Sequence, residues 1–387
     1  MDKENMTPEQ RKAERQKALK FQRNVRIAAI LLAIVLSIVS LVQSCSTRKA
    51  IEDLAAQIAA KKAAQAQEEM LASPSPDASV SAGTSVTLSF IGDVTPASSF
   101  SGDGAFESYY NQYGESYFFQ NVRSLFEADD LTVASLGCTF TAAELQEEGA
   151  AAYRADPAYA NILSLGGIDA VSVSNENIMY FGDEGYVDTL AHLDNAGISR
   201  FGGDYVTTTT LSQDISLGLT AVNALSDGAG ERMESNIQQL KEDGTKIIVA
   251  LLYLGDQEAN DPLVSGTNLA HAAIDAGAHL VVGYGTGELR GIEHYNGRYI
   301  CYDLGAFLTG NSTSAGDAIV FQQTFQVVNG IVLSDADFTI IPCSTSTDIA
   351  ANTYCPTPAI GTEAERILAE VYEQSAGMEG GIEQETE

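Results

Sequence analysis

The segment VTLSFIGDVTP, residues Val86–Pro96, decides the expected fold of this chain. Its first half is β-branched, aliphatic and aromatic, which is typical of a buried strand. Gly92 and Asp93 then interrupt the apolar run before a turn at Pro96. Ligands of α/β sheets bind at the carboxyl ends of strands, so Asp93 is a candidate functional carboxylate, and Gly92 permits a sharp turn or a close backbone approach. A plain strand with an Asp-capped turn also fits, and the rest of the chain must decide.

The length and charge of the chain limit how many domains it can form and which partners it can bind. The 387 residues are 45% hydrophobic, which suits one large or two ordinary folded domains. Residues 1–50 hold ten Lys and Arg against four Asp and Glu, whereas the remainder holds eleven against forty-eight. Residues 51–387, called the body below, are so acidic that nucleic acid is not expected as a partner, because phosphate binding needs clustered cations. The charge of the body also disfavours tight binding of a polyanion unless metal ions bridge the two.

The amino-terminal region predicts a membrane anchor. Residues 1–26 carry eight Lys and Arg, and the nineteen residues 27–45 carry no charge. At roughly 1.5 Å per residue, this apolar segment just crosses a hydrocarbon core of about 30 Å. We therefore expect a cytoplasmic segment (1–26), a single transmembrane helix (27–45) and a main domain outside the cell membrane. A cleaved signal peptide and lipidation at Cys45 are alternatives, but the long head and Gln43 fit them less well.

The remainder divides into three parts. Residues 46–85 predict a helical stalk followed by a Ser/Pro/Ala linker. Residues 86–346 alternate β-rich runs with helical stretches, which predicts a layered α/β domain. Residues 347–387 predict a helix at Thr362–Gln374 and a disordered acidic tail at Gly377–Glu387. The expected strands include 131–137, 169–175, 216–225, 245–255, 279–285 and 298–308, and the expected helices include 186–196 and 269–276.

Five segments in this order resemble the CapA family of capsule and poly-γ-glutamate synthesis proteins. They are SFIGDV, ADDLTVASLG, the long GIDAVSVSNENIMYFGDEGYVDTLAHLDNAGI, LAHAAIDAGAHLVVG and YDLGAF. The resemblance implies a bacterial, metallophosphatase-like α/β/β/α sandwich, commonly membrane-anchored, with Asp93 as the first metal ligand. It covers about 250 residues, between Val86 and Pro342.

The metal-binding pattern that the resemblance implies is largely replaced in this sequence. Asn-Leu-Glu becomes Ser135-Leu136-Gly137, and Asn-Asn-His becomes Asn175-Glu176-Asn177. A His-Trp-Gly strand end becomes Tyr253-Leu254-Gly255, and His-His-Pro-His becomes Tyr284-Gly285-Thr286-Gly287. None of the four histidines, His192, His271, His279 and His294, falls at a ligand position. We therefore expect a vestigial cleft formed by Asp93, Asn175, Glu176, Asn177, Tyr253, Tyr284 and Asp303, and we assign no catalytic residue.

A harder cation remains an alternative for this cleft. Asp93 and Glu176 are the candidate ligands, with Asn175, Asn177 and Asp256 or Glu258 as further oxygen donors. Oxygen-only sites suit Mg²⁺ or Ca²⁺. The competing interpretation is that these are ordinary loop carboxylates in an acidic chain. No other cofactor is expected, since the glycines of residues 283–287 lack the spacing and the following helix of a dinucleotide site.

Two functions from different classes therefore stay open. The first is a non-catalytic, membrane-tethered protein that assists capsule, poly-γ-glutamate or other envelope polymer assembly through contacts with a synthase or transporter. The second is a metal-dependent hydrolase of the envelope, acting on phosphoester or γ-glutamyl bonds. The replaced ligands favour the first. Cys343 and Cys355 are close enough in sequence for a loop disulfide outside the cell, and free thiols are the alternative.

Overall fold

The computed structural model describes residues 83–144, 153–175, 177–211, 214–255, 262–334, 337–348 and 350–384. These residues fall within the unit Pro74–Glu387. The predicted cytoplasmic segment, transmembrane helix and most of the stalk and linker lie outside the described residues. None of the described helices is long and apolar enough to cross a membrane.

The first sheet is built around β1 (Thr84–Thr95), the segment that the sequence singled out. Its order is β17-β16-β14-β1-β2-β5-β6, with β1, β2, β5 and β6 parallel and β14, β16 and β17 added antiparallel. The other strands in this order are β17 (Thr357–Pro358), β16 (Asp337–Ser344), β14 (Asp317–Val328), β2 (Leu131–Leu136), β5 (Ala170–Ser172) and β6 (Ser199–Phe201). Short β13 (Leu308–Thr309) pairs with the end of β1, and β15 (Ile331–Val332) pairs with β14.

The second sheet has the order β11-β12-β10-β9-β8-β7. Its members are β11 (Ile292–Tyr295), β12 (Arg298–Cys301), β10 (Leu280–Tyr284), β9 (Ile247–Tyr253), β8 (Ser216–Asn223) and β7 (Thr207–Thr210). The four central strands are parallel, and the edge strands β11 and β7 are antiparallel. A small separate pair joins β3 (Thr139–Phe140) to β4 (Arg154–Ala155).

The two sheets pack face to face across one apolar core. Alternate residues of β1, such as Val86, Leu88 and Phe90, meet Leu219, Val249 and Val282 of the second sheet. All six are at most 2% exposed. Apolar side chains at every second position of a strand point to one face, and this period aligns the two sheets.

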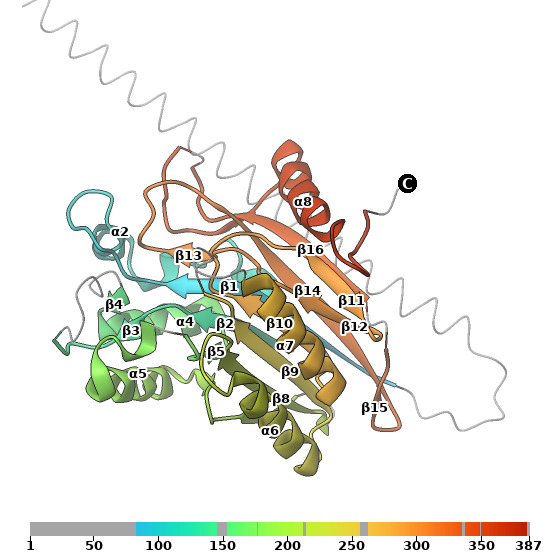
Figure 1. The fold of residues 1–387 in the computed structure, drawn as a ribbon. Helices are drawn as coiled ribbons and strands as arrows, with labels where there is room; N and C mark the ends of the chain where they lie inside the picture. Colours follow the sequence, from blue (N-terminus) through green and yellow to red (C-terminus); the bar gives the residue numbers. More distant parts are fainter. Residues whose placement is uncertain are drawn as a thin grey trace, which may run out of the picture. The chain divides into compact units, whose positions relative to one another are not determined.

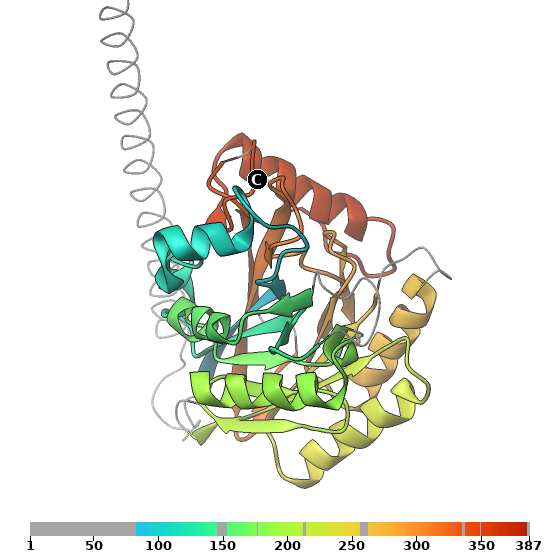
Figure 2. The same ribbon diagram turned by 90° about the vertical axis from the view of Figure 1, so that its left-hand side faces the viewer.

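Helices cover the outer faces of this sandwich (Figures 1 and 2). The helices α6 (Ala229–Glu242) and α7 (Pro262–Ala276) pack on the second sheet, where Met233, Ile237 and Leu240 form the apolar stripe of α6. The helices α4 (Ala160–Gly166) and α5 (Gly182–Ala196) lie on the side of β5 and β6. Further short helices are α2 (Phe106–Tyr113) and α3 (Arg123–Phe126). The mixed α/β architecture with two facing sheets confirms the predicted fold class at this level.

The carboxyl-terminal region matches one expectation and corrects another. Helix α8 (Thr362–Ser375) matches its prediction and contributes Ile367 and Val371 to the core between the sheets. The predicted disorder beyond it is wrong as far as Gln384, because backbone hydrogen bonds join His294 N to Gly380 O and Ile382 N to Ile292 O. The apolar Ile382 packs on the core and outweighs the acidic composition that favoured disorder.

Of the two alternatives for Cys343 and Cys355, a loop disulfide or free thiols, the structure shows free thiols. Cys343 and Cys355 are both buried free thiols. Cys343 lies within β16, whereas the Cys355 thiol donates to Tyr117 O and faces Asn121. Closeness in sequence therefore did not bring the two sulfur atoms together.

Candidate functional site

Asp93 lies where β1 shifts its register against β2, so the strand bulges here and continues to Thr95. Its carboxylate accepts hydrogen bonds from Ser135 Oγ of β2 and from Gly285 N, the latter at 3.1 Å. Burial raises the pKa of the Asp93 carboxyl to about 6, although both hydrogen bonds lower it. Asp93 is partly buried and keeps some exposed surface.

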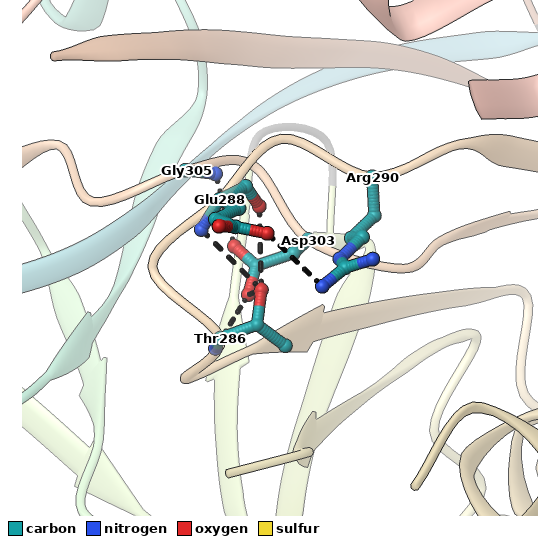
Figure 3. Close-up of polar contacts among 5 residues, drawn as sticks. All are labelled: Thr286, Glu288, Arg290, Asp303 and Gly305. Carbon is teal, nitrogen blue, oxygen red and sulfur yellow. Dashed lines mark hydrogen bonds and ion pairs between the residues drawn. The ribbon is translucent and has the colours of Figure 1, made fainter. Parts of the chain in front are cut away.

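Asp303 follows β12 and brings a second carboxylate to the same place. It is fully buried, and its oxygens accept from Gly305 N at 2.9 Å and from Thr286 N and Oγ1 at 2.9 and 2.8 Å. Figure 3 shows this ring of donors around Asp303, with the neighbouring ion pair between Arg290 and Glu288 at 3.1 Å. Burial and the nearby charge of Asp93 raise the pKa of Asp303 to about 7.

Glycines let the two acidic segments approach closely. A Cβ at Gly92 would lie 1.8 Å from Gly305 O, which no side chain tolerates. Phe307 N in turn donates to Asp93 O at 3.0 Å. The sequence offers two reasons for a glycine at position 92, a sharp turn or a close approach of another backbone segment. Gly92 does not have a positive φ, so the close approach of Gly305 is the reason that the structure supports.

Tyr284 ends β10 and ties the second sheet to the first. Its hydroxyl lies 2.7 Å from Ser172 Oγ and donates to Ser174 O at 2.8 Å. The Tyr253 ring packs against it edge to face, with centroids 5.6 Å apart. Burial raises the pKa of Tyr284, and the Asp93 charge adds to that rise, so the phenol stays protonated and acts as a hydrogen-bond donor.

Asn175 and Asn177 line the adjoining end of β2 and β5. Asn175 Nδ2 donates to Leu136 O, and Asn177 Nδ2 donates to Gly137 O at 3.4 Å. Each side chain is at most 7% exposed, yet neither Oδ1 atom has a hydrogen-bond partner among the described residues. Such oxygens are costly when buried, so these two acceptors are suited to a donor or cation supplied from outside the chain.

The structure thus brings together most of the predicted cleft. Asp93, Tyr253, Tyr284 and Asp303 meet where the carboxyl ends of strands from both sheets converge, and Asn175 and Asn177 lie at the adjoining strand end. Glu176, Asp256 and Glu258 lie outside the described residues. Sequence reasoning missed Ser135 and Ser172 as hydrogen-bonding groups, although their positions near the ends of expected strands could have indicated them.

The four histidines belong to other parts of the fold. His192 lies in α5, and His271 Nε2 lies 2.8 Å from Glu293 Oε1 beside α7. His279 Nδ1 accepts from Ile248 N at 3.0 Å, and burial lowers its pKa to about 4. His294 packs near Tyr299. The contacts of the last three are therefore structural, and Asp93 takes part in none of them.

A binuclear metal centre does not fit these residues. Two-metal hydrolases hold their ions about 3.5–4 Å apart with several strong ligands. Within the described ranges, no group of three or more His, Cys, Asp or Glu side chains could hold a metal ion. The oxygens of Asp93 and Asp303 already accept hydrogen bonds from this chain.

Parts of the chain are similar to known proteins. Residues 87–215 and 206–311 match the family described as bacterial capsule synthesis protein PGA_cap. The PGA biosynthesis protein CapA of Bacillus subtilis (strain 168) is 25% identical over 247 residues, which span 58% of this chain and 63% of that protein. The crystal structure of TT1561 of Thermus thermophilus aligns with a TM-score of 0.36 and 12% identity, over 61% of this chain and 94% of the other. Since the family match covers more than half of its length, the chain belongs to the bacterial capsule synthesis protein family PGA_cap.

Proposed function

We propose that this chain is a membrane-anchored, extracytoplasmic member of its family that assists capsule, poly-γ-glutamate or other envelope polymer assembly without a working binuclear metal centre. The observation that carries the proposal is the engagement of Asp93 and Asp303 by donors of the same chain. Asp93 joins the first sheet to the Gly285 amide that follows β10, and the Tyr284 hydroxyl adds a second link between the sheets. Asp303 holds the segments that follow β10 and β12 together. Carboxylates that already accept hydrogen bonds from their own chain act here as links in the framework rather than as ligands of a metal pair.

The charge of the chain supports a protein as its partner. The body carries forty-eight acidic and eleven basic residues beyond position 50, so an anionic polymer is repelled unless cations intervene. A synthase or transporter subunit of the envelope is easier to bind, because protein surfaces can supply complementary charge. The single transmembrane helix at 27–45, with the amino terminus in the cytoplasm, would hold the chain beside such a subunit.

A substitution at Asp93 tests this proposal. In a strain lacking the chromosomal copy, Asp93→Asn is expected to restore surface polymer to the wild-type amount, because an amide keeps the shape and one acceptor oxygen. Polymer is quantified on the cell surface, and immunoblotting confirms equal protein abundance. Loss of polymer at normal abundance would contradict the proposal, as would cross-linking that captures polymer but no envelope protein.

The alternative is a metal-dependent hydrolase of the envelope, and the two unpartnered amide oxygens favour it. Asn175 Oδ1 and Asn177 Oδ1 are acceptors of the kind that bind Mg²⁺ or Ca²⁺. Such an ion would also need Asp93 to give up a hydrogen bond. Calorimetry of the purified chain with millimolar Mg²⁺ or Ca²⁺ decides whether an ion binds. Heat of binding in the wild type that disappears in Asn175→Ala would support the alternative. No heat in the wild type would exclude it.

A further inference from the structure

We propose that a surface of three tyrosines on α2 and the short 3₁₀ helix η2 (Glu115–Tyr117) is a docking site for an arginine-rich segment of a partner protein. The three rings, named here the tyrosine triad, are Tyr109, Tyr113 and Tyr117. Tyr113 and Tyr117 are stacked with centroids 4.6 Å apart, and the Tyr109 centroid lies 5.8 and 6.1 Å from theirs. Tyr113 is 49% exposed, so part of this aromatic surface is open to solvent.

The tyrosine triad is held in a fixed arrangement. Tyr109 and Tyr113 are four residues apart on α2 and therefore share one face of the helix. The Tyr117 hydroxyl donates to Thr353 O at 3.0 Å, and the buried Tyr354 ring packs edge to face against Tyr109 at 5.1 Å. Rings that are already in place lose little freedom when a partner binds.

The segments that build this surface carry no positive charge. They are residues 98–122, which contain the triad, and residues 155–166 and 345–357, which pack beside it. The Tyr159 ring lies 4.5 Å from the Tyr110 ring, and the third segment supplies the contacts to Tyr117 and Tyr109 described above. The three segments contain no Lys, Arg or His, and their carboxylates are Asp103, Glu107, Glu115, Asp156 and Asp348.

The negative charge reaches the aromatic cluster itself. The Tyr110 hydroxyl donates to Glu115 Oε1 at 2.9 Å. Burial, together with Glu115 and Asp156, raises the pKa of Tyr110 to about 12. Burial also raises the pKa of Tyr109, and the nearby Asp348 adds to that rise. A group that binds among these rings therefore meets a negative electrostatic potential.

A guanidinium group matches this combination of aromatic faces and carboxylates. The face of a tyrosine ring attracts cations, and arginine both stacks on aromatic rings and pairs with carboxylates. The cations next to these segments in sequence are Arg123, which pairs with Glu127 at 2.8 Å, and Arg154, which donates to Ala143 O at 3.3 Å. The carboxylates around the triad disfavour an anionic polymer or an anionic lipid at the same place.

The tyrosine triad lies at the same end of the first sheet as the candidate site. Ser98 follows β1 and donates to Gly310 O at 2.7 Å, and Asn352 Nδ2 donates to Thr309 O of β13 at 2.8 Å. Figure 1 shows α2 beyond the end of β1, near β13. The inference rests on the proposed function, because that proposal assigns a protein partner to the chain, and it adds the surface and the chemistry of the contact.

Peptide binding to the purified full-length chain tests the docking site. The probe is a fluorescein-labelled peptide of alternating arginine and serine, and its binding is followed by fluorescence anisotropy at physiological ionic strength. Tyr113→Ala is expected to weaken binding at least about fivefold, because it removes the exposed ring of the triad. Tyr113→Phe keeps the aromatic face and should retain most of the affinity.

Tyr205→Ala is the matched control. Tyr205 is 57% exposed and follows Asp204, so this variant also removes an exposed ring beside a carboxylate without changing the net charge. Its affinity for the peptide should equal that of the wild type. Equal weakening in the two alanine variants would show that the peptide responds to the overall charge of the chain, and it would overturn the docking site. Unchanged binding in Tyr113→Ala would overturn it as well.

A neutral probe separates a cationic partner from a glycan. Maltohexaose binding that is lost in Tyr113→Ala, with peptide binding unchanged, would assign the triad to sugar rings and overturn the proposal. The Asp93→Asn complementation described above tests the proposed function separately. Restored polymer there, without Tyr113-dependent peptide binding, overturns the docking site alone. Tyr113-dependent binding together with lost polymer overturns the proposed function alone.

Discussion

Replacing Gly92 by alanine is expected to destabilise the folded domain by about 3 kcal/mol or more, which is near the upper end of single-substitution effects. The added Cβ would lie 1.8 Å from Gly305 O and 2.9 Å from Gly305 C. Both contacts are with backbone, so no side-chain rotation relieves them. The segments carrying Asp93 and Asp303 would have to separate, and the hydrogen bond from Phe307 N to Asp93 O would be lost.

Gly230→Ala is the matched control for this prediction. Gly230 lies in the first turn of α6, and the nearest atom to an added Cβ is Leu269 Cδ1 at 4.0 Å. Alanine should stabilise this helix by up to about 1 kcal/mol. Urea unfolding of both variants measures the two free energies. Equal and small effects at the two glycines would show that β1 and the Gly305 loop are not closely packed.

Folding stability is expected to decrease as the pH rises from 5 to 8. Burial raises the native pKa of Asp93 to about 6 and of Asp303 to about 7, against an ordinary value of 3.8. Between these values the unfolded chain has released protons that the native state still binds, so the free energy of unfolding falls with pH. The contribution is fully present below about pH 4 and is lost as the pH passes through the native pKa values. The rise at Asp93 alone corresponds to about 3 kcal/mol.

A variant and high salt separate this effect from general charge repulsion. Asp303→Asn removes one titrating group, so its stability should depend less steeply on pH than that of the wild type, even if it is lower throughout. High salt screens repulsion among surface carboxylates but acts little on buried groups. Asp129, whose pKa burial raises to about 7, contributes in the same direction in both proteins. The free energy of unfolding is measured in urea at pH 5 and pH 8 for the wild type and for Asp303→Asn. A wild type that is more stable at pH 8 than at pH 5, or an equal pH dependence of the two proteins, would contradict the assignment.

Local sequence patterns predicted the strands and helices because these elements depend on short-range periodicity. The apolar runs at 131–137 and 279–285 became β2 and β10, and Gly197, with φ of 76°, ends α5 as its position suggested. The segment 298–308 was predicted as one strand, but it forms β12 and β13 separated by Asp303 and Gly305. The buried carboxylate and the positive φ of 76° at Gly305 interrupt it.

Contacts between distant segments could not be read from local patterns. Asp93 and the Gly285 amide are 192 positions apart, and only the packing of the two sheets brings them together. The same holds for Ile382, which lies in an acidic segment but donates its backbone N–H to Ile292 O, 90 positions earlier in the chain. The family resemblance predicts Asp93, Asn175 and Tyr284 as residues of the site. It does not predict which groups donate hydrogen bonds to the two carboxylates, because those contacts form only when distant segments pack together.

Elemental analysis of the purified full-length chain tests the central claim most directly. Because the oxygens of Asp93 and Asp303 accept hydrogen bonds from their own chain and no imidazole of the described residues bonds to them, we expect far less than one transition-metal ion per chain. The same content is expected for Asp93→Ala. Two transition-metal ions per wild-type chain, lost in Asp93→Ala, would contradict the account.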